Sequence, residues 1–141
     1  MATVHDIAHY ILKQKGSMTA MKLQKLVYYS QAWALVWDDA PLFEEEIQAW
    51  ANGPVVPELY QRHRGMFMLN LKKDIKPHLD ENQRDTVDKV LDFYAPMTSQ
   101  QLSDLTHSER PWLDARAGLA DGERGERVIS LASMAEFYSS L

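Results

Sequence analysis

Two histidines near the N-terminus are the first side chains in the sequence that could hold a metal ion. His5 and His9 stand four residues apart in the stretch HDIAH, so a helix would place both on one face. Asp6 stands where the zinc-hydrolase pattern H-E-x-x-H has its glutamate, but aspartate is too short for that role and no third ligand can be assigned. We interpret the pair as part of a solvated helix face, and we expect no metal and no other cofactor.

Other chemistry-bearing patterns are equally incomplete. The sequence has no cysteine, no G-x-S-x-G nucleophile motif and no G-x-x-x-x-G-K-[ST] phosphate loop. Five carboxylates fall between Asp38 and Glu46, yet they lack the alternating ligands and fixed glycine of a calcium-binding EF-hand. We therefore predict that the chain is not an enzyme, has no catalytic residue, and carries this acidic run on its surface.

Charge argues against nucleic acid as the main partner. The 141 residues include 20 Asp and Glu but only 15 Lys and Arg, which gives a formal net charge of −5, the wrong sign for neutralising phosphates. One basic cluster could still engage DNA if its members converge, and it consists of Arg62, Arg64, Lys72, Lys73 and Lys76 with Lys22 or Lys25. With no signal-peptide pattern and no 18-residue apolar run, we expect a cytoplasmic protein that does not bind membranes.

Aromatic residues give the strongest indication of a binding function. Seven of them crowd between Tyr28 and Tyr60, and aromatic side chains are enriched among the anchors of protein interfaces. The alternative is that most of them simply form the core. The candidate partner-binding residues combine aromatics with the acidic run, where carboxylates could steer a basic partner: Tyr28, Trp37, Glu44, Glu45, Glu46, Trp50, Asn52 and Tyr60.

Helix signals divide most of the chain. Thr3 with Asp6 predicts a helix start that Gly16 ends, and Thr19 caps a segment, residues 20–37, that is apolar on two sides and should be a central hub. Its exposed strip is expected to carry Lys22, Lys25 and Gln31. Further helices are predicted from Pro57 to Gly65, after Asp80, after Thr98, around Pro111, and after Ser130 with Leu131, Met134, Phe137, Tyr138 and Leu141 facing inward.

The fold class that follows is mainly α. We predict one compact domain, residues 1–141, in which five to seven short helices surround the apolar helix 20–37, with one small β element near residues 46–50 and 127–129. Residues 49–60, AWANGPVVPELY, form a corner with a turn at Asn52 and Gly53. The conformation of residues 66–79 stays open.

Three blocks of sequence have a distinctive pattern: KLQKLVYYSQAW (22–33), PLFEEEIQAWANGPVVPELYQRHRG (41–65) and LSDLTHSERPW (102–112). Together they resemble the Panacea domain family, which includes SocA-like and phage-associated GepA-like antitoxins. They occur in the family's order along nearly the whole chain. The family's signature positions fall on Lys22, Leu23, Lys25, Leu26, Tyr28, Trp50, Gly53, Pro54, Val55, His107, Pro111 and Trp112.

The resemblance implies a helical antitoxin of a type II toxin–antitoxin system that binds and neutralises a protein toxin encoded beside it. It does not identify the toxin, because family toxins are of several unrelated kinds. The alternatives are a DNA-binding regulator of its own operon and an adaptor that delivers the toxin to a protease. Assembly into a homo-oligomer is compatible with each of these three roles.

Overall fold

The computed structural model describes residues 2–71 and 76–141. The elements follow one another as α1 (Val4–Lys15), β1 (Met18–Thr19), α2 (Ala20–Trp37), β2 (Gln48–Trp50), β3 (Gly53–Val55), α3 (Pro57–His63), β4 (Met68–Leu69), α4 (Glu81–Tyr94), α5 (Ser99–His107), α6 (Arg110–Ala115) and α7 (Leu131–Ser139). The predicted fold class, mainly α around a central helix 20–37, is confirmed.

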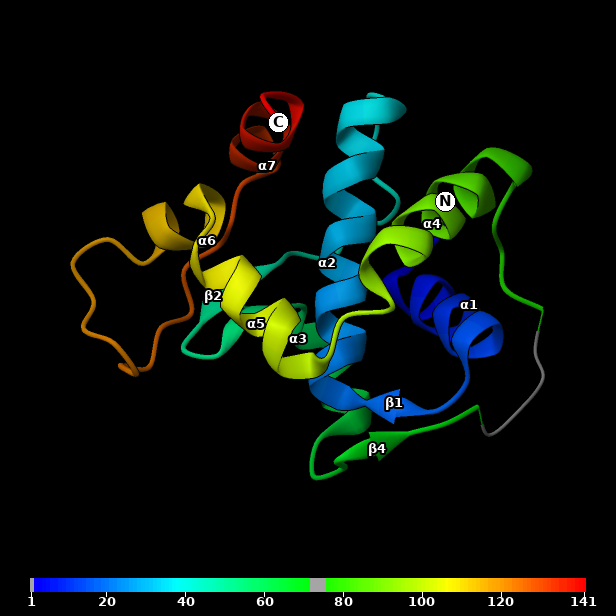
Figure 1. The fold of residues 1–141 in the computed structure, drawn as a ribbon, viewed down its shortest axis with the longest axis horizontal. Coiled ribbons are helices and arrows are strands. Elements are labelled where there is room, and N and C mark those ends of the chain that lie inside the picture. Colours follow the sequence, from blue (N-terminus) through cyan, green and yellow to red (C-terminus); the bar gives the residue numbers. More distant parts are fainter. Residues whose placement is uncertain (1, 72–75) are drawn as a thin grey trace.

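Helix α2 runs through the middle of the molecule, with α1 and α4 on one side and α5, α6 and α7 on the other (Figure 1). The core forms where these helices meet it, and twelve of its 18 residues are buried. A helix buried on this scale must pair its polar side chains inside the protein, because an unpaired buried polar group destabilises the fold. Most polar residues of α2 do so.

The expected exposed strip of α2 is therefore wrong at two positions out of three. Lys25 and Gln31 are each 1% exposed. Gln31 bridges to the following loop, where its amide donates to the Phe43 carbonyl (2.9 Å) and accepts from the Leu42 N–H (2.7 Å). Lys22 is half-buried and donates to the Ala95 carbonyl. The polar side chains of this helix mostly contact other segments of the protein rather than solvent.

Helix starts are where the sequence predicted them, because the capping side chains act locally. Thr3, Asp80 and Thr98 each begin a helix with a reciprocal capping box, and Thr19 and Ser130 accept from a backbone N–H in the first turn of α2 and α7. Each cap satisfies donors that the first turn of a helix leaves unpaired.

Two short antiparallel pairs complete the described fold. β2 pairs with β3 through Ala49 and Pro54, and residues 127–129 join the edge of β2 through bonds such as Ile129 N–H to the Ile47 carbonyl. This confirms the predicted β element. β1 pairs with β4 (Met18 with Leu69), which settles part of the segment 66–79 as a strand; residues 72–75 lie outside the described residues.

Helix α7 buries less than its pattern predicted. Met134 and Tyr138 are fully buried, but Leu131 is 44% and Leu141 73% exposed. The helix has only nine residues. Met134 and Tyr138, one turn apart, therefore reach the core, whereas Leu131 and Leu141 lie beyond the region where α7 packs against it. The prediction was wrong for Leu131 and Leu141.

A buried carboxylate connects three helices near the C-terminus. The Glu109 side chain, 7% exposed, accepts hydrogen bonds from the hydroxyls of Tyr29 (2.7 Å) and Tyr138 (2.8 Å) at the same oxygen. The Tyr138 hydroxyl also lies 3.0 Å from that of Tyr28. Burial raises the pKa of Glu109, and the two tyrosine bonds only partly offset this. The network pairs hydroxyl groups that the core would otherwise leave unsatisfied.

Replacing Glu109 should separate the roles of its charge and its oxygen. Glu109→Ala leaves buried hydroxyls without an acceptor and should lower the free energy of unfolding by about 3 kcal/mol, whereas Glu109→Gln keeps an acceptor and should change it by less than about 1 kcal/mol at pH 7. Because folding raises the Glu109 pKa above its ordinary value of 4.5, stability of the natural chain relative to Glu109→Gln should rise as pH falls from 7 toward 4.5. Urea titrations at several pH values measure both effects; equal losses in the two variants would contradict this assignment.

Candidate functional site

The corner predicted at residues 49–60 packs directly against α2. Gly53 has φ +123°, a conformation that side chains rarely adopt, and a Cβ added there would lie 2.4 Å from Cε of Lys25 and 3.2 Å from the Thr106 hydroxyl. Only glycine allows the backbone to pass so close to the lysine. The β2–β3 turn is therefore held against one side chain of α2 and one of α5.

Gln24 fixes the other end of the corner. Its side-chain oxygen accepts from the Val56 N–H (2.9 Å), and its amide nitrogen lies 2.9 Å from Nε2 of His63. Both partners are buried, so this one glutamine positions the start and the end of α3. Burial lowers the pKa of His63, which keeps the imidazole neutral at pH 7.

Helices α5 and α6 hold the hairpin from its other side. The Trp112 indole N–H donates to the Trp50 carbonyl (2.8 Å), the Arg116 guanidinium to the Ala49 carbonyl (3.1 Å), and the Ser103 hydroxyl to the Asn52 carbonyl (3.1 Å). These side chains satisfy backbone carbonyls that the short β2–β3 pairing leaves free.

His107 and Trp112 form the contact between α5 and α6. Their rings stack at 4.2 Å with 13° between planes. Burial is the main cause that lowers the pKa of His107, and the charge of Lys25 adds to it. The Nε2 atom of His107 is buried without a hydrogen-bond partner. A neutral ring that stacks on the indole is consistent with both observations.

A cavity of about 910 Å³ opens between the start of α2, the β2–β3 hairpin, α3 and residues 122–126; we call it the corner pocket. Trp50 and Tyr60 form an aromatic wall, with ring centroids 5.0 Å apart and planes at 68°. Both are only partly buried. The lining of the pocket thus combines apolar and aromatic side chains with about as many polar and charged ones, so it can both pack against a ligand and hydrogen-bond to it.

Lys25 lines this pocket and is unusual because it is a buried charged residue without a partner in the described ranges. The side chain is 1% exposed, and it forms no side-chain hydrogen bond and no ion pair with any residue in the described ranges. Burial lowers its pKa from 10.5 to about 8. A buried ammonium group without a counter-ion costs stability, so this lysine demands a separate explanation.

Charged side chains at the pocket are mostly cationic. Besides Lys25, the lining includes Arg64 and Arg124, both exposed, and one carboxylate, Glu126. Glu126 is already engaged with Arg124 at 3.1 Å. The net charge of the lining is therefore positive, although the whole chain carries −5.

The structure brings together three of the sequence-predicted partner-binding residues. Trp50, Asn52 and Tyr60 all line the corner pocket. Tyr28, in contrast, is 1% exposed inside the core, so it cannot contact a partner while the domain is folded. Its burial follows from its place on the face of α2 that packs against α7, where its ring lies 6.1 Å from that of Tyr138.

The other predicted residues lie elsewhere. Trp37, 47% exposed at the far end of α2, stacks on Trp33. In the acidic run, Glu44 and Glu46 are exposed, and the half-buried Glu45 accepts from the Val4 N–H at the start of α1. Their proposed steering role stays a prediction, and they do not line the corner pocket.

The N-terminal histidines do not form a recognisable metal centre. Nε2 of His5 lies 3.6 Å from the Glu58 carboxylate, and no group of three potential ligands meets in the described part of the chain. Nε2 atoms of both His5 and His9 are buried without hydrogen-bond partners.

Many of the residues that we predicted as family signature positions form the corner. Lys25, Gly53, His107 and Trp112 are in the contacts above, and Pro54 pairs with Ala49 in the hairpin. The others lie around it or elsewhere in the core: Leu23 and Leu26 are core residues of α2, Val55 is buried, Pro111 lies in the first turn of α6, and Lys22 ties α2 to the end of α4. Sequence reasoning missed Gln24, Ser103 and Arg116, whose only signal is a polar residue on an otherwise apolar face.

Comparison with known proteins now identifies the class. Residues 23–113, which include most of α2 and the whole corner, match the family model described as "Antitoxin SocA-like, Panacea domain". The chain therefore belongs to this family of antitoxin-like domains. No solved structure matches it significantly.

One curated relative is the protein named Antitoxin SocA from Caulobacter vibrioides (strain NA1000 / CB15N). It is 30% identical over 106 residues, a match that covers 65% of this chain and 56% of the relative. The chain thus spans little more than half the length of that relative. Within the described residues, no helix combines the length and apolar character needed to cross a membrane.

Removing the buried charge should change the pH dependence of stability. Because folding lowers the Lys25 pKa from 10.5 to about 8, the natural chain should gain stability relative to Lys25→Met as pH rises from 8 to 10.5, by about 3 kcal/mol in all. At pH 7 the methionine variant should be the more stable protein, since it fills similar space without a charge. Urea titrations in phosphate-free buffer measure the difference between the two proteins, in which the shared tyrosine titrations cancel. A constant difference across this pH range would show that Lys25 is solvated.

Proposed function

We propose that this chain is the antitoxin of a type II toxin–antitoxin pair and that it neutralises a protein toxin, encoded by an adjacent gene, by direct binding. Family membership supports the antitoxin role. Family membership does not identify the partner or the mode of neutralisation, because the match covers only 56% of the curated relative. These two parts of the function are therefore our proposal. The observation that carries direct binding is an exposed apolar surface beside the corner pocket.

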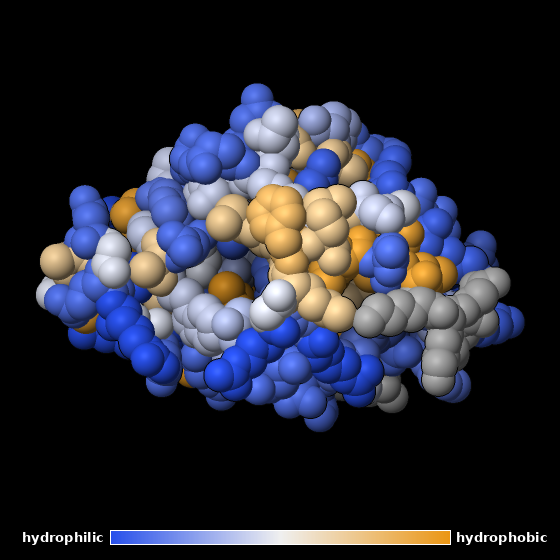
Figure 2. All heavy atoms as spheres, turned by 90° about the horizontal axis from the view of Figure 1, so that it is seen from below, coloured by the Kyte–Doolittle hydropathy of each residue, from blue (hydrophilic) through white to orange (hydrophobic). Residues whose placement is uncertain are grey.

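Four side chains form this surface, which we call the apolar patch: Met21 (38% exposed), Met66 (39%), Phe67 (75%) and Met68 (54%). Figure 2 shows apolar atoms gathered at this face of the molecule, next to a hollow. The β1–β4 pairing and the bond from the Ala20 N–H to the Phe67 carbonyl hold the two segments together. Flexible methionines around an aromatic ring suit a protein-binding surface.

The apolar patch continues into the corner pocket, since Met21 and Met66 also line it. Trp50 and Tyr60 then extend the same face with aromatic area, the residue type that most often anchors an interface. A toxin bound here would cover the patch and place a protruding group in the pocket. Neutralisation would follow if the covered toxin surface includes its active site or its substrate-binding region.

Operator DNA has less support as a primary partner. Arg62, Arg64 and Lys76 are exposed, but Lys25 is buried and Lys72 and Lys73 lie outside the described residues. The predicted basic cluster therefore stays a prediction, and the net charge of −5 opposes binding to phosphates.

Co-expression tests the proposed function directly. Expression of the adjacent gene alone should arrest growth, and simultaneous expression of this chain should restore it and yield a complex that co-purifies. The same two genes with an early stop codon in this chain provide the control. A toxic neighbour that this chain neither rescues nor binds would refute the proposal.

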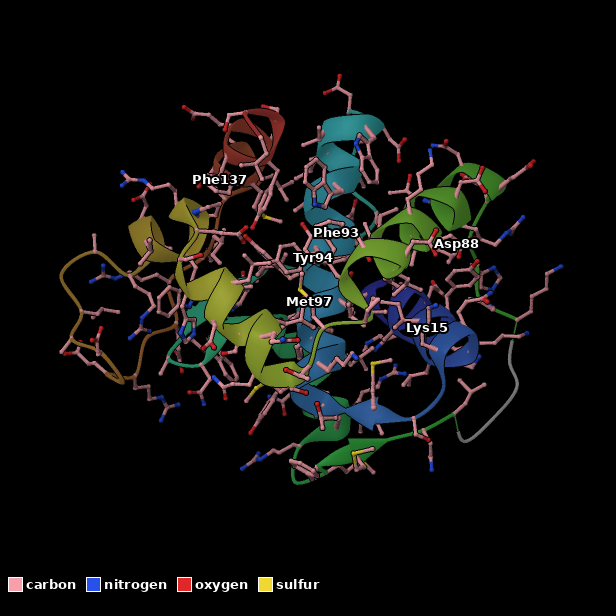
Figure 3. The ribbon with its side chains drawn as sticks, viewed as in Figure 1. Lys15, Asp88, Phe93, Tyr94, Met97 and Phe137 are labelled. Atoms are coloured by element: carbon pink, nitrogen blue, oxygen red, sulfur yellow. The ribbon has the colours of Figure 1, made fainter. Side chains whose placement is uncertain are left out.

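Variants of one exposed ring locate the interface. Phe67→Ser should abolish rescue or weaken toxin binding by at least about tenfold, as expected for an interface anchor, with little change in the unfolding midpoint because Phe67 is 75% exposed. Phe93→Ser is the matched control, since Phe93 is 65% exposed and belongs to α4, outside the apolar patch (Figure 3). Equal rescue by both variants would place the interface elsewhere.

A further inference from the structure

The unpaired lysine in the corner pocket calls for a ligand. Lys25 is almost completely buried, lines the pocket, and meets no carboxylate in the described structure. The thioether of a methionine or the chain of a leucine would occupy this position without the cost of desolvating an ammonium group. A negatively charged group in the pocket would offset this desolvation cost, because a hydrogen bond between an ammonium group and an anion is stronger than one between neutral groups.

The surroundings favour an anion over a cation or a neutral guest. Of the charged side chains that line the pocket, Arg64 adds its positive charge to that of Lys25, and the only carboxylate, Glu126, is paired with Arg124, so these two cancel. The buried His63 is tied to Gln24 at 2.9 Å and has a lowered pKa, so it contributes no charge that would repel or replace the lysine at pH 7.

The walls of the pocket suggest what carries the anion. Trp50 and Tyr60 offer aromatic surface within the same cavity as Lys25, and the volume of about 910 Å³ has room for much more than an ion. Gly53 holds the lysine in place, since its backbone runs against Cε of the side chain. Charge on one side and aromatic surface on another suit a molecule with an anionic end and an apolar body.

We propose that the corner pocket is a binding site for an oxyanion, a carboxylate or phosphate group, that pairs with the Lys25 ammonium while the rest of the ligand packs against Trp50 and Tyr60. The oxyanion can belong to a free small molecule or to an acidic side chain of a bound protein. The site does not depend on the antitoxin role, so either proposal can fail without the other.

Inorganic phosphate is the simplest probe. Adding it to the ¹⁵N-labelled full chain should shift the Trp50 indole signal and the backbone signals of Asn52 and Gly53, and the shifts should saturate. A parallel titration with sodium chloride at equal ionic strength controls for screening. Phosphate should also raise the pKa of Lys25, followed through the ¹³Cε shift of its side chain, because a bound anion favours the charged lysine.

Two lysine variants on one helix make the test specific. Lys25→Met should weaken phosphate binding by about tenfold or more, as expected when a charge-assisted bond is lost. Lys22→Met removes a lysine one turn away that bonds to the Ala95 carbonyl and does not line the pocket, and it should bind phosphate like the natural chain. Shifts that fail to saturate, or that persist in Lys25→Met, would overturn the proposal.

Two further measurements identify the source of the anion. Mass spectrometry of small molecules released by denaturing the purified chain should find about one anionic compound per chain if the natural ligand is free. If a protein partner supplies the group, the chain should release none, and formation of the toxin complex should itself raise the Lys25 pKa and block the phosphate-induced shifts. A chain that releases no anion and keeps its phosphate response in the complex would exclude the protein partner as the source and assign the site to a free anion that exchanges during purification.

Discussion

The whole arrangement depends on hydrogen bonds from polar side chains of α2 to the backbone of other segments. Gln24 bonds to the start of α3, Gln31 to the loop at Leu42 and Phe43, and Lys22 to the end of α4. A buried helix can have such residues only where a partner is fixed in space, because an unpaired amide inside a protein is costly. Each bond therefore specifies where an otherwise irregular segment must lie.

This constraint explains why the corner can be built from so little regular structure. The β2–β3 pair has only three residues in each strand, too few to be stable alone. Side chains from three helices hold it instead: Gln24 from α2, Ser103 from α5, and Trp112 and Arg116 from the region of α6. The pocket beside the hairpin is thus bordered by backbone whose position is fixed from several directions.

The same physics decides what the sequence could predict. Helix starts depend on residues three apart, such as Thr98 and Gln101, so they are visible locally and were predicted correctly. The two-residue β1–β4 pairing joins segments about fifty positions apart and leaves no periodic signal. The burial of Lys25 and Gln31 was mispredicted because amphipathic patterns assume that polar residues face water, and their surroundings come from distant segments.

The candidate site divides in the same way. Trp50, Asn52 and Tyr60 were grouped correctly around one corner because they are close in the sequence, and the fold places them on one pocket. Tyr28 and Trp37 lie on α2 with Lys25, but neither lines the pocket. Tyr28 faces the core, and Trp37 is exposed at the far end of the helix. No local pattern distinguishes an aromatic core residue from an anchor, since both are large and apolar.

Gln24 and Lys25 differ in whether the fold alone explains their burial. Neighbours on α2, both are buried and polar, yet Gln24 has protein partners for its oxygen and its nitrogen, whereas Lys25 has none among the described side chains. The glutamine is explained by the position of α3. We expect the lysine to lower the stability of the isolated domain, and the Gly53 backbone passes close to Cε of its side chain. Its presence is best understood from the state in which the corner pocket is occupied.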